Sequence, residues 1–304
     1  MKRRVLLLAM GLLATAALSW LFAGSSDSGA DPNGEDPLSI GPVDNIMRPE
    51  HLGIANHRMT TSVPYETVGT VAGLWAVPYV SSDRRLVPTL DGEPVAVADY
   101  RWYPVRFVSS GSRGGVELQS NVVLIAGRRA AVGELSLRNR SDEIKEGALT
   151  LSLTPPTLDK TDEWLFSTRT SETPAAAAEE PGALCFTQGE SGICLAAEGE
   201  LSLDDDRPRC RFDYSLGPNE TAVFYYTVAI GPAEEARRAA GEIAADPRGA
   251  IAESLKAYRA EREAIAEYLP ALESDNSQWV GLYDRSLLQF FTNRWEGEGF
   301  LLRP

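Results

Sequence analysis

The chain is short of the residues that most often carry metal or nucleophilic chemistry. It has only two histidines, His51 and His57, and their spacing of six fits no metal-binding motif. It also lacks a Gly-x-Ser-x-Gly sequence, because Ser191 in Gly189-Glu-Ser-Gly192 has the wrong spacing and falls in a turn signal. The sequence therefore indicates no metal, no cofactor and no serine nucleophile.

Positive charge is also scarce. Acidic residues outnumber basic ones by 43 to 29, which gives a formal net charge of −14, and only four of the basic residues are lysines. This negative net charge argues against nucleic acid or an anionic membrane surface as a partner, because both would be repelled. A neutral carbohydrate would be neither attracted nor repelled by it. With 304 residues and 43% apolar content, the chain can bury a proper core and is not a disordered protein.

Three cysteines, Cys185, Cys194 and Cys210, leave at least one thiol unpaired. The first two flank Gln188-Gly-Glu-Ser-Gly192, a turn signal, so they can face each other across a hairpin. Three buried thiols that behave as small apolar groups are the alternative. The sequence leaves both readings open.

The N-terminus has the pattern of an export signal. A basic start, Lys2-Arg3-Arg4, precedes an apolar run from Val5 to Leu18 and then small residues. Residues 1–23 are thus expected to be a cleaved signal peptide or an uncleaved anchor that tethers the chain to a membrane, and the protein is expected in the periplasm or outside the cell. Residues 24–61 read as a flexible acidic linker.

Residues 62–232 show a period of two, which is typical of half-buried strands. Leu135 and Leu137 alternate with polar residues, and after a polar turn Leu149, Leu151 and Leu153 do the same. This pattern predicts two neighbouring strands of one sheet. Further strands are expected in 95–108, 116–125 and 210–216, and in 222–230, where both faces are apolar. The fold class is therefore mainly β, a large antiparallel β-sandwich.

At Pro232 the period changes to 3.6. The segment 233–272 reads as a helical linker lying across the sandwich, with one apolar stripe on residues 250–269. After a second break, Asp275 and Gln278 have capping-box spacing. The helix that they begin, 275–292, is apolar around most of its circumference and is expected to need partners on several sides.

The last part of the chain resembles a known group of enzymes. The runs that carry the resemblance are Leu282-Tyr-Asp-Arg-Ser-Leu-Leu288, Asn293-Arg-Trp295 and Gly299-Phe-Leu-Leu-Arg-Pro304. They resemble the beginning of the catalytic barrel in bacterial mannosylglycerate-hydrolase-like and trehalase-like glycoside hydrolases, which are related to glucosidase I and the glycogen-debranching glucosidases. This motif covers about a tenth of the chain. The resemblance implies a β-sandwich, a helical linker and an (α/α)6 barrel, of which 273–304 is the truncated start.

The same resemblance places the catalytic acid and base beyond residue 304, so no catalytic residue is expected in this chain. Arg294, Trp295 and Arg303 are the candidate substrate-binding residues, because an aromatic ring and guanidinium groups commonly hold a polar ligand such as a carbohydrate. The alternative is that Trp295 packs at the helix end and Arg294 caps its last carbonyls. Two functions stay open: the non-catalytic part of an exported glycoside hydrolase, and a complete exported glycan-binding or scaffold protein.

Overall fold

The computed structural model describes residues 51–276 except 65, 77, 154–158, 161–175, 181 and 205–206, and also residues 279–283 and 286. The predicted signal or anchor and most of the linker before Ser62 lie outside the described residues. So does most of the predicted barrel segment. In the part that is described, no helix is both long and apolar enough to cross a membrane.

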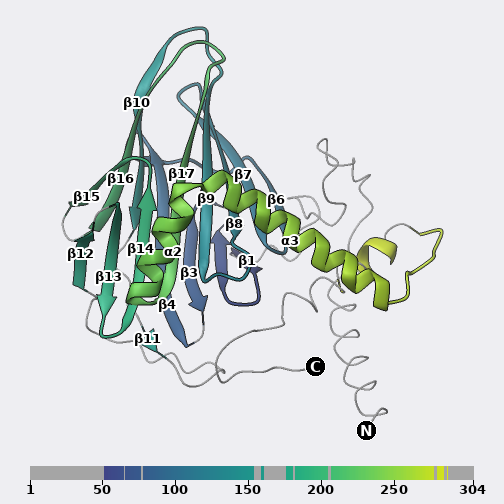
Figure 1. The fold of residues 1–304 in the computed structure, drawn as a ribbon. Helices are drawn as coiled ribbons and strands as arrows, with labels where there is room; N and C mark the ends of the chain where they lie inside the picture. Colours follow the sequence, from purple (N-terminus) through teal and green to yellow (C-terminus); the bar gives the residue numbers. More distant parts are fainter. Residues whose placement is uncertain are drawn as a thin grey trace.

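Two antiparallel sheets lie face to face, which confirms the predicted mainly β sandwich (Figure 1). The first sheet has the spatial order β1 (His51–Ala55), β2 (Thr60–Pro64), β3 (Val71–Ala76), β4 (Tyr79–Leu90), β10 (Lys145–Leu153), β16 (Arg207–Leu216) and β15 (Glu200–Asp204), with β5 (Glu93–Pro94) and β11 (Asp159–Lys160) also paired to β4. The second has the order β12 (Ala176–Glu180), β13 (Ala183–Gln188), β14 (Ser191–Ala197), β17 (Thr221–Pro232), β9 (Ala130–Asn139), β8 (Val116–Leu124), β7 (Arg106–Arg113) and β6 (Asp99–Tyr103).

The main core fills the space between the sheets. Both sheets contribute alternate side chains to it, as strands with one buried face must. Leu135 and Leu137 of β9 and Leu149 and Leu151 of β10 are all fully buried there. Alternation in the sequence therefore identified the inward-facing residues of these two strands.

The pairing of these two strands was predicted wrongly. β9 and β10 are consecutive in the chain but belong to different sheets, so the connection 140–144 is an arch over the edge of the core and not a hairpin. β9 pairs with β17, and β10 pairs with β16. Alternation shows which face of a strand is buried but carries no information on its neighbour, because both arrangements bury the same leucines.

β16 and β17 form a second arch of the same kind, and the two arches meet at Asn139. This residue is fully buried, and its side-chain amide donates to the carbonyl oxygens of Glu143, Leu216 and Gly217 at 2.6, 2.9 and 3.1 Å. Its side-chain oxygen accepts from the Ser141 backbone N–H and hydroxyl. One amide therefore ties the two arches together.

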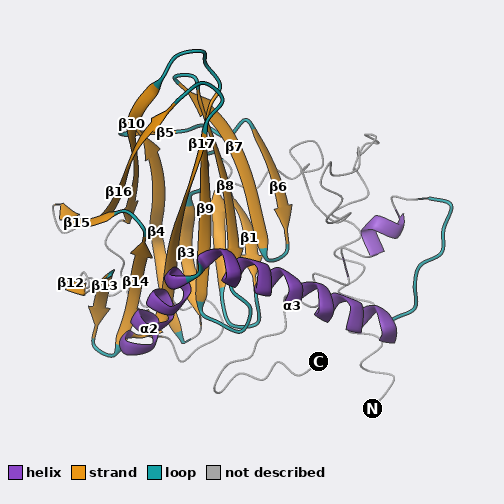
Figure 2. Cartoon of the chain, turned by 45° about the horizontal axis from the view of Figure 1, so that its top comes forward, coloured by secondary structure: helices purple, strands orange, loops and turns teal. Residues whose placement is uncertain are grey.

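β17 is covered on both faces, as its sequence predicts. Tyr226, Val228 and Ile230 lie in the core between the sheets, whereas Tyr225 and Ala229 lie in a second cluster on the outer face of the eight-stranded sheet. That second cluster is closed by helices. α2 (Ala233–Ala245) contacts β14 and β17, and α3 (Pro247–Tyr268) crosses the sheet and continues past it (Figures 1 and 2). Pro232 ends β17 where the period of the sequence changes.

Within the described residues, the contacts of α3 with the sandwich come from its first part. Ile251 and Tyr258 are buried, and Ser254 accepts a hydrogen bond from the backbone N–H of Ala126 at 3.1 Å. His57, which has no metal-binding spacing, lies 2.7 Å from a carboxylate oxygen of Glu261. Leu269, the last residue of the predicted apolar stripe, lies beyond this contact and is exposed.

Two boundaries also differ from the sequence prediction. The first sheet begins at His51, before the predicted start at Ser62, and Ile54 is fully buried although it was assigned to the linker. The strand is short and lies at the sheet edge, so its alternation is too brief to recognise. The run 95–108 is divided between β6 and β7, because Pro104 lies in a two-residue turn between the paired Tyr103 and Arg106.

Candidate functional site

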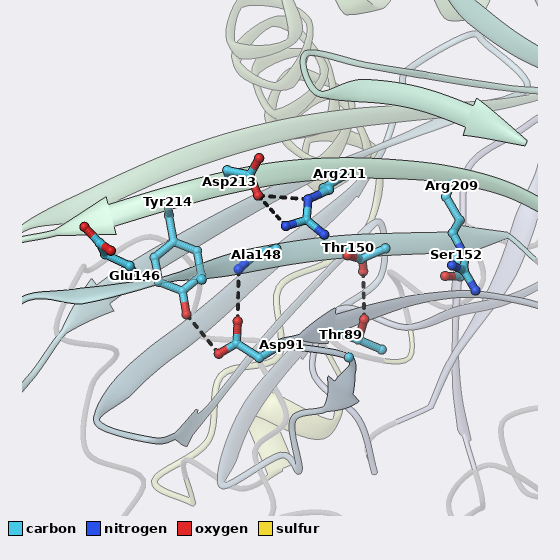
Figure 3. Close-up of a pocket in the computed structure, with 12 residues that line it drawn as sticks. Thr89, Asp91, Glu146, Ala148, Thr150, Ser152, Arg209, Arg211, Asp213 and Tyr214 are labelled. Carbon is cyan, nitrogen blue, oxygen red and sulfur yellow. Dashed lines mark hydrogen bonds and ion pairs between the residues drawn. The ribbon is translucent and has the colours of Figure 1, made fainter. Parts of the chain in front are cut away.

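An open groove of about 810 Å3 lies over β4, β10 and β16 (Figure 3). Its lining is mostly hydroxyl, carboxylate and guanidinium groups from these three strands. Leu151 and Phe212 point into the core, so residues next to them in the sequence, such as Thr150 and Arg211, lie on the outer face of the nine-stranded sheet. Tyr214 belongs to the core cluster, on the same side of β16 as Phe212, so the groove reaches the edge of the core at its Asp91 end. The described helices cover the other sheet and leave this face open (Figure 2).

Register places the groove residues in rows across the strands. Thr89 of β4 pairs with Thr150 of β10, which pairs with Arg211 of β16. The next row along places Ser152 opposite Arg209. Neighbouring strands are about 4.8 Å apart, so each row presents polar groups at a regular short spacing.

Asp91 is held at one end of the groove by a tight turn. Asp91 and Gly92 have positive φ values, 53° and 83°, and connect β4 to β5 as a two-residue type I′ hairpin. The Asp91 carboxylate accepts a hydrogen bond from the backbone N–H of Ala148 at 2.9 Å and another from the Tyr214 hydroxyl at 3.2 Å. A carboxylate has about four acceptor positions, so capacity for a ligand remains.

Gly147 makes room for this arrangement. A Cβ atom at Gly147 would lie 2.2 Å from a carboxylate oxygen of Asp91 and 2.5 Å from the Tyr214 hydroxyl. Both distances are far inside van der Waals contact. A side chain at this position would therefore push the Asp91 and Tyr214 pair out of place.

Tyr214 keeps its proton in this setting. Burial, together with the negative charge and the hydrogen bond of Asp91, raises the pKa of Tyr214 to about 12. The phenol is therefore a neutral donor at neutral pH, and Asp91 is its acceptor. The pair presents a fixed negative group at the groove end.

The remaining charges of the groove are partly paired. The guanidinium group of Arg211 bonds to Asp213 at 2.8 Å on the same strand, and the Ser215 hydroxyl donates to Glu146 at 3.3 Å. Asp91, Glu146 and Asp213 face two guanidinium groups, so the groove has a slight excess of negative charge. The arrangement can donate to and accept from a ligand rich in hydroxyl groups.

The predicted substrate-binding residues, Arg294, Trp295 and Arg303, lie outside the described residues. No geometry relates them to the groove. Asp91 and Tyr214 were not predicted as site residues, although Asp91-Gly92 between apolar runs is a strong hairpin signal. The polar half of the alternation in 149–153 was the other available signal, and only the apolar half was interpreted.

Comparisons with known proteins give structural similarity only. No protein-family model matches the sequence, and no curated protein matches it. A candidate kojibiose phosphorylase from the human microbiome is 10% identical, with a TM-score of 0.49 over 73% of this chain and 37% of that one. A bacterial glucoamylase complexed with acarbose is 11% identical, with a TM-score of 0.46 over 77% of this chain and 39% of that one.

A GalM/aldose epimerase homologue from C. elegans is 12% identical, with a TM-score of 0.37 over 60% of this chain and 99% of that one. The chain thus spans less than two fifths of the phosphorylase and of the glucoamylase. All three identities are too low to assign an activity, and TM-scores below 0.5 support no functional argument.

Proposed function

We propose that this chain is the non-catalytic β-sandwich part of an exported glycoside hydrolase that acts on α-glycosides or glycosylglycerates. Its catalytic acid and base would belong to a helical barrel outside these 304 residues. One observation carries the proposal. The end of α3 and the segment that follows it carry large apolar side chains that are exposed, and this stretch leads into the segment with the barrel-like motif.

The exposed groups are clustered in this short stretch. Tyr268, Leu269, Leu272 and Trp279 are 85%, 40%, 36% and 55% exposed, and the run Leu282-Tyr-Asp-Arg-Ser-Leu-Leu288 follows at once. Large exposed apolar groups that lie together typically mark a surface that another body covers. A helical domain built on 273–304 would be such a body.

The carboxylates near the motif do not provide the chemistry on their own. Glycoside hydrolysis needs one carboxyl group to protonate the leaving oxygen and a second one, about 6–10 Å away in an inverting enzyme, to activate water. Glu296 and Glu298 are two residues apart in sequence, too close to flank a sugar from opposite sides without a second wall. This supports a division between the sandwich and a separate catalytic part.

Two features support export. Residues 1–23 have the signal pattern, and Cys185 and Cys194 form a disulfide between β13 and β14. Structural disulfides persist in oxidising compartments and are rare in the cytosol. Whether the first segment is cleaved or kept as a membrane tether would follow from the N-terminal sequence of the mature protein.

The proposal is tested by an activity assay on the purified full chain. Mannosylglycerate, glucosylglycerate, trehalose and α-linked disaccharides are incubated with it, and released monosaccharide is followed. We expect no turnover above the protein-free control. Turnover that survives repurification and disappears in Glu296→Gln would show that the chain is catalytic by itself. The nucleotide sequence after codon 304 gives a second test, because the proposal requires alternating helices there.

A further inference from the structure

We infer that the groove over β4, β10 and β16 is a binding site for a neutral oligosaccharide chain, with the Asp91 carboxylate as its fixed acceptor. This binding site would add a ligand to the proposed function, and the inference rests on that function only for the choice of probes. The lining residues of the groove are different from the candidates Arg294, Trp295 and Arg303, which lie outside the described residues. The strands that carry the groove belong to the nine-stranded sheet, whereas α2 and α3 pack on the eight-stranded sheet (Figure 2).

The Asp91 carboxylate is held in position before any ligand binds. Three segments converge to fix one carboxylate: the turn at Asp91, the backbone of Ala148 and the hydroxyl of Tyr214. Gly147 leaves the space that this convergence requires. A polar group already held in position loses little conformational entropy when a ligand binds, so such a group favours recognition.

The groove is lined by both hydrogen-bond donors and acceptors, as a sugar requires. Sugar hydroxyl groups both donate and accept hydrogen bonds, so they need acceptors and donors side by side. The groove supplies acceptors in Asp91 and Glu146, donors in Arg209 and Arg211, and a hydroxyl in Thr150. Very little of this set would suit an apolar ligand.

The charge of the groove favours a neutral ligand. Carboxylates exceed guanidinium groups in the groove, and the guanidinium group of Arg211 is already bonded to Asp213. The whole chain carries a formal net charge of −14. An anionic polysaccharide would therefore be repelled, while the two arginines disfavour a cationic chain. A neutral chain fits best.

The groove is also long and open. One row, Thr89, Thr150 and Arg211, is polar across three strands, and the next, Ser152 and Arg209, is polar across two. A volume of about 810 Å3 is near the upper end of the range for small-molecule pockets. A chain of several sugar units uses such a surface better than one unit does. Tyr214 is only 7% exposed and gives little area for stacking, so we expect weak binding, with a Kd of about 0.1–1 mM.

The test is titration of the full chain with maltohexaose, cellohexaose and mannohexaose, followed by chemical shifts or calorimetry. Hexagalacturonate and hexalysine serve as anionic and cationic probes. We expect at least one neutral hexasaccharide to bind and both charged probes to bind more weakly or not at all. Tighter binding of either charged probe, or no binding of any neutral one, would overturn the inference.

Variants locate the site. Asp91→Asn removes the charged acceptor and is expected to weaken binding about tenfold. Thr150→Val keeps the shape and β propensity but deletes a hydroxyl, so it remains informative if Asp91→Asn fails to fold, and it should weaken binding about three- to fivefold. Glu253→Gln, an exposed carboxylate on α3, is the matched control and should have no effect.

If the neutral probe binds equally well to both groove variants, the site is elsewhere and the inference is wrong. This result does not depend on the hydrolysis assay, which measures released monosaccharide and not binding. An inactive chain whose groove does not bind would leave the proposed function intact. An active chain whose groove binds would refute the proposed function alone.

Discussion

Asn139 illustrates how much a single buried polar side chain can determine in this fold. It lies where β9 turns into the first arch, is inaccessible to solvent, and satisfies three backbone carbonyls and two groups of Ser141. Its own backbone carbonyl also accepts from the N–H of Asn219 in the second arch. Each buried carbonyl that is left without a hydrogen-bond donor lowers the free energy of unfolding by about several tenths to a few kcal/mol.

We therefore expect Asn139→Ala to lower the free energy of unfolding by about 2–4 kcal/mol. Denaturant unfolding at equilibrium measures this change. Asn121→Ala is the control, because Asn121 lies on the adjacent strand β8 and its side-chain oxygen has no hydrogen-bond partner. The control should change stability by less than about 1 kcal/mol. Equal effects of the two substitutions would show that the corner has no special role.

Three buried acidic groups predict the behaviour at alkaline pH. Burial raises the pKa of Cys210 from 9.0 to about 12 and that of Tyr214 from 10.0 to about 12, and it raises the pKa of the fully buried Tyr226 as well. Below pH 9 these groups keep their protons in both states. Above it the unfolded chain releases them first and binds fewer protons, so stability falls as pH rises toward 12.

The expected outcome is a steady decrease in the free energy of unfolding between about pH 9 and about pH 11. Tyr226→Phe removes one of the groups while keeping the ring in the core, so its decrease should be shallower. Denaturant titrations at a series of pH values provide the measurement. Stability that stays constant over this range would contradict the assigned burial of these groups.

For single residues, the sequence predicted correctly which side chains are buried, but it did not predict which distant residues they contact. The inward leucines of β9 and β10 were correct because alternation reports them directly. Asp91 and Asn139 were not identified, because their importance comes from groups 57 and 77 residues away in the chain. Only the hairpin signal at Asp91-Gly92 was visible locally.

For helices and strands too, local features were predicted correctly and long-range contacts were not. The end of β17 at Pro232 and the start of the helices agree with the change of period, since period reflects local geometry. The apolar stripe of α3 was also recognised, but nothing in the sequence indicated which of its residues contact the sandwich. Ile251 and Tyr258 are buried against the sandwich, whereas Leu269 is beyond the sheet and exposed.

The hairpin of β13 and β14 resolves the question about the cysteines. Cys185 and Cys194 are direct partners in the register and form a disulfide, while Cys210 is a buried free thiol. We expect thiol titration of unfolded, unreduced protein to give one thiol per chain, and three after reduction. The double substitution Cys185→Ser and Cys194→Ser should lower stability by about 2–3 kcal/mol. Three thiols before reduction would favour the alternative of separate buried thiols.

Among the described residues, helices cover the outer face of the eight-stranded sheet, and none of them contacts the nine-stranded sheet in the same way. Removing 273–304 should leave the sandwich folded, because the buried clusters formed by the described residues end at Tyr258. Because it also removes exposed Trp279, it should reduce self-association. Light scattering and the unfolding midpoint of the shortened chain measure both effects.

A longer deletion provides the contrast. Removing 233–304 takes away α2 and α3 and uncovers the apolar cluster around Ala229, so this variant should aggregate or unfold. If the shorter deletion also unfolds the sandwich, the segment after α3 belongs to the core of this domain. The exposed side chains would then need another explanation.

The two arches also determine the order in which the chain can assemble. The contacts that join them connect residues 77 positions apart, so neither arch acquires its partners until a long loop has closed. Chains dominated by such distant pairings fold over milliseconds to seconds. The Asn139 amide needs both arches in place, and its hydrogen bonds should therefore form after the main barrier. We expect Asn139→Ala to accelerate unfolding and to leave the refolding rate almost unchanged.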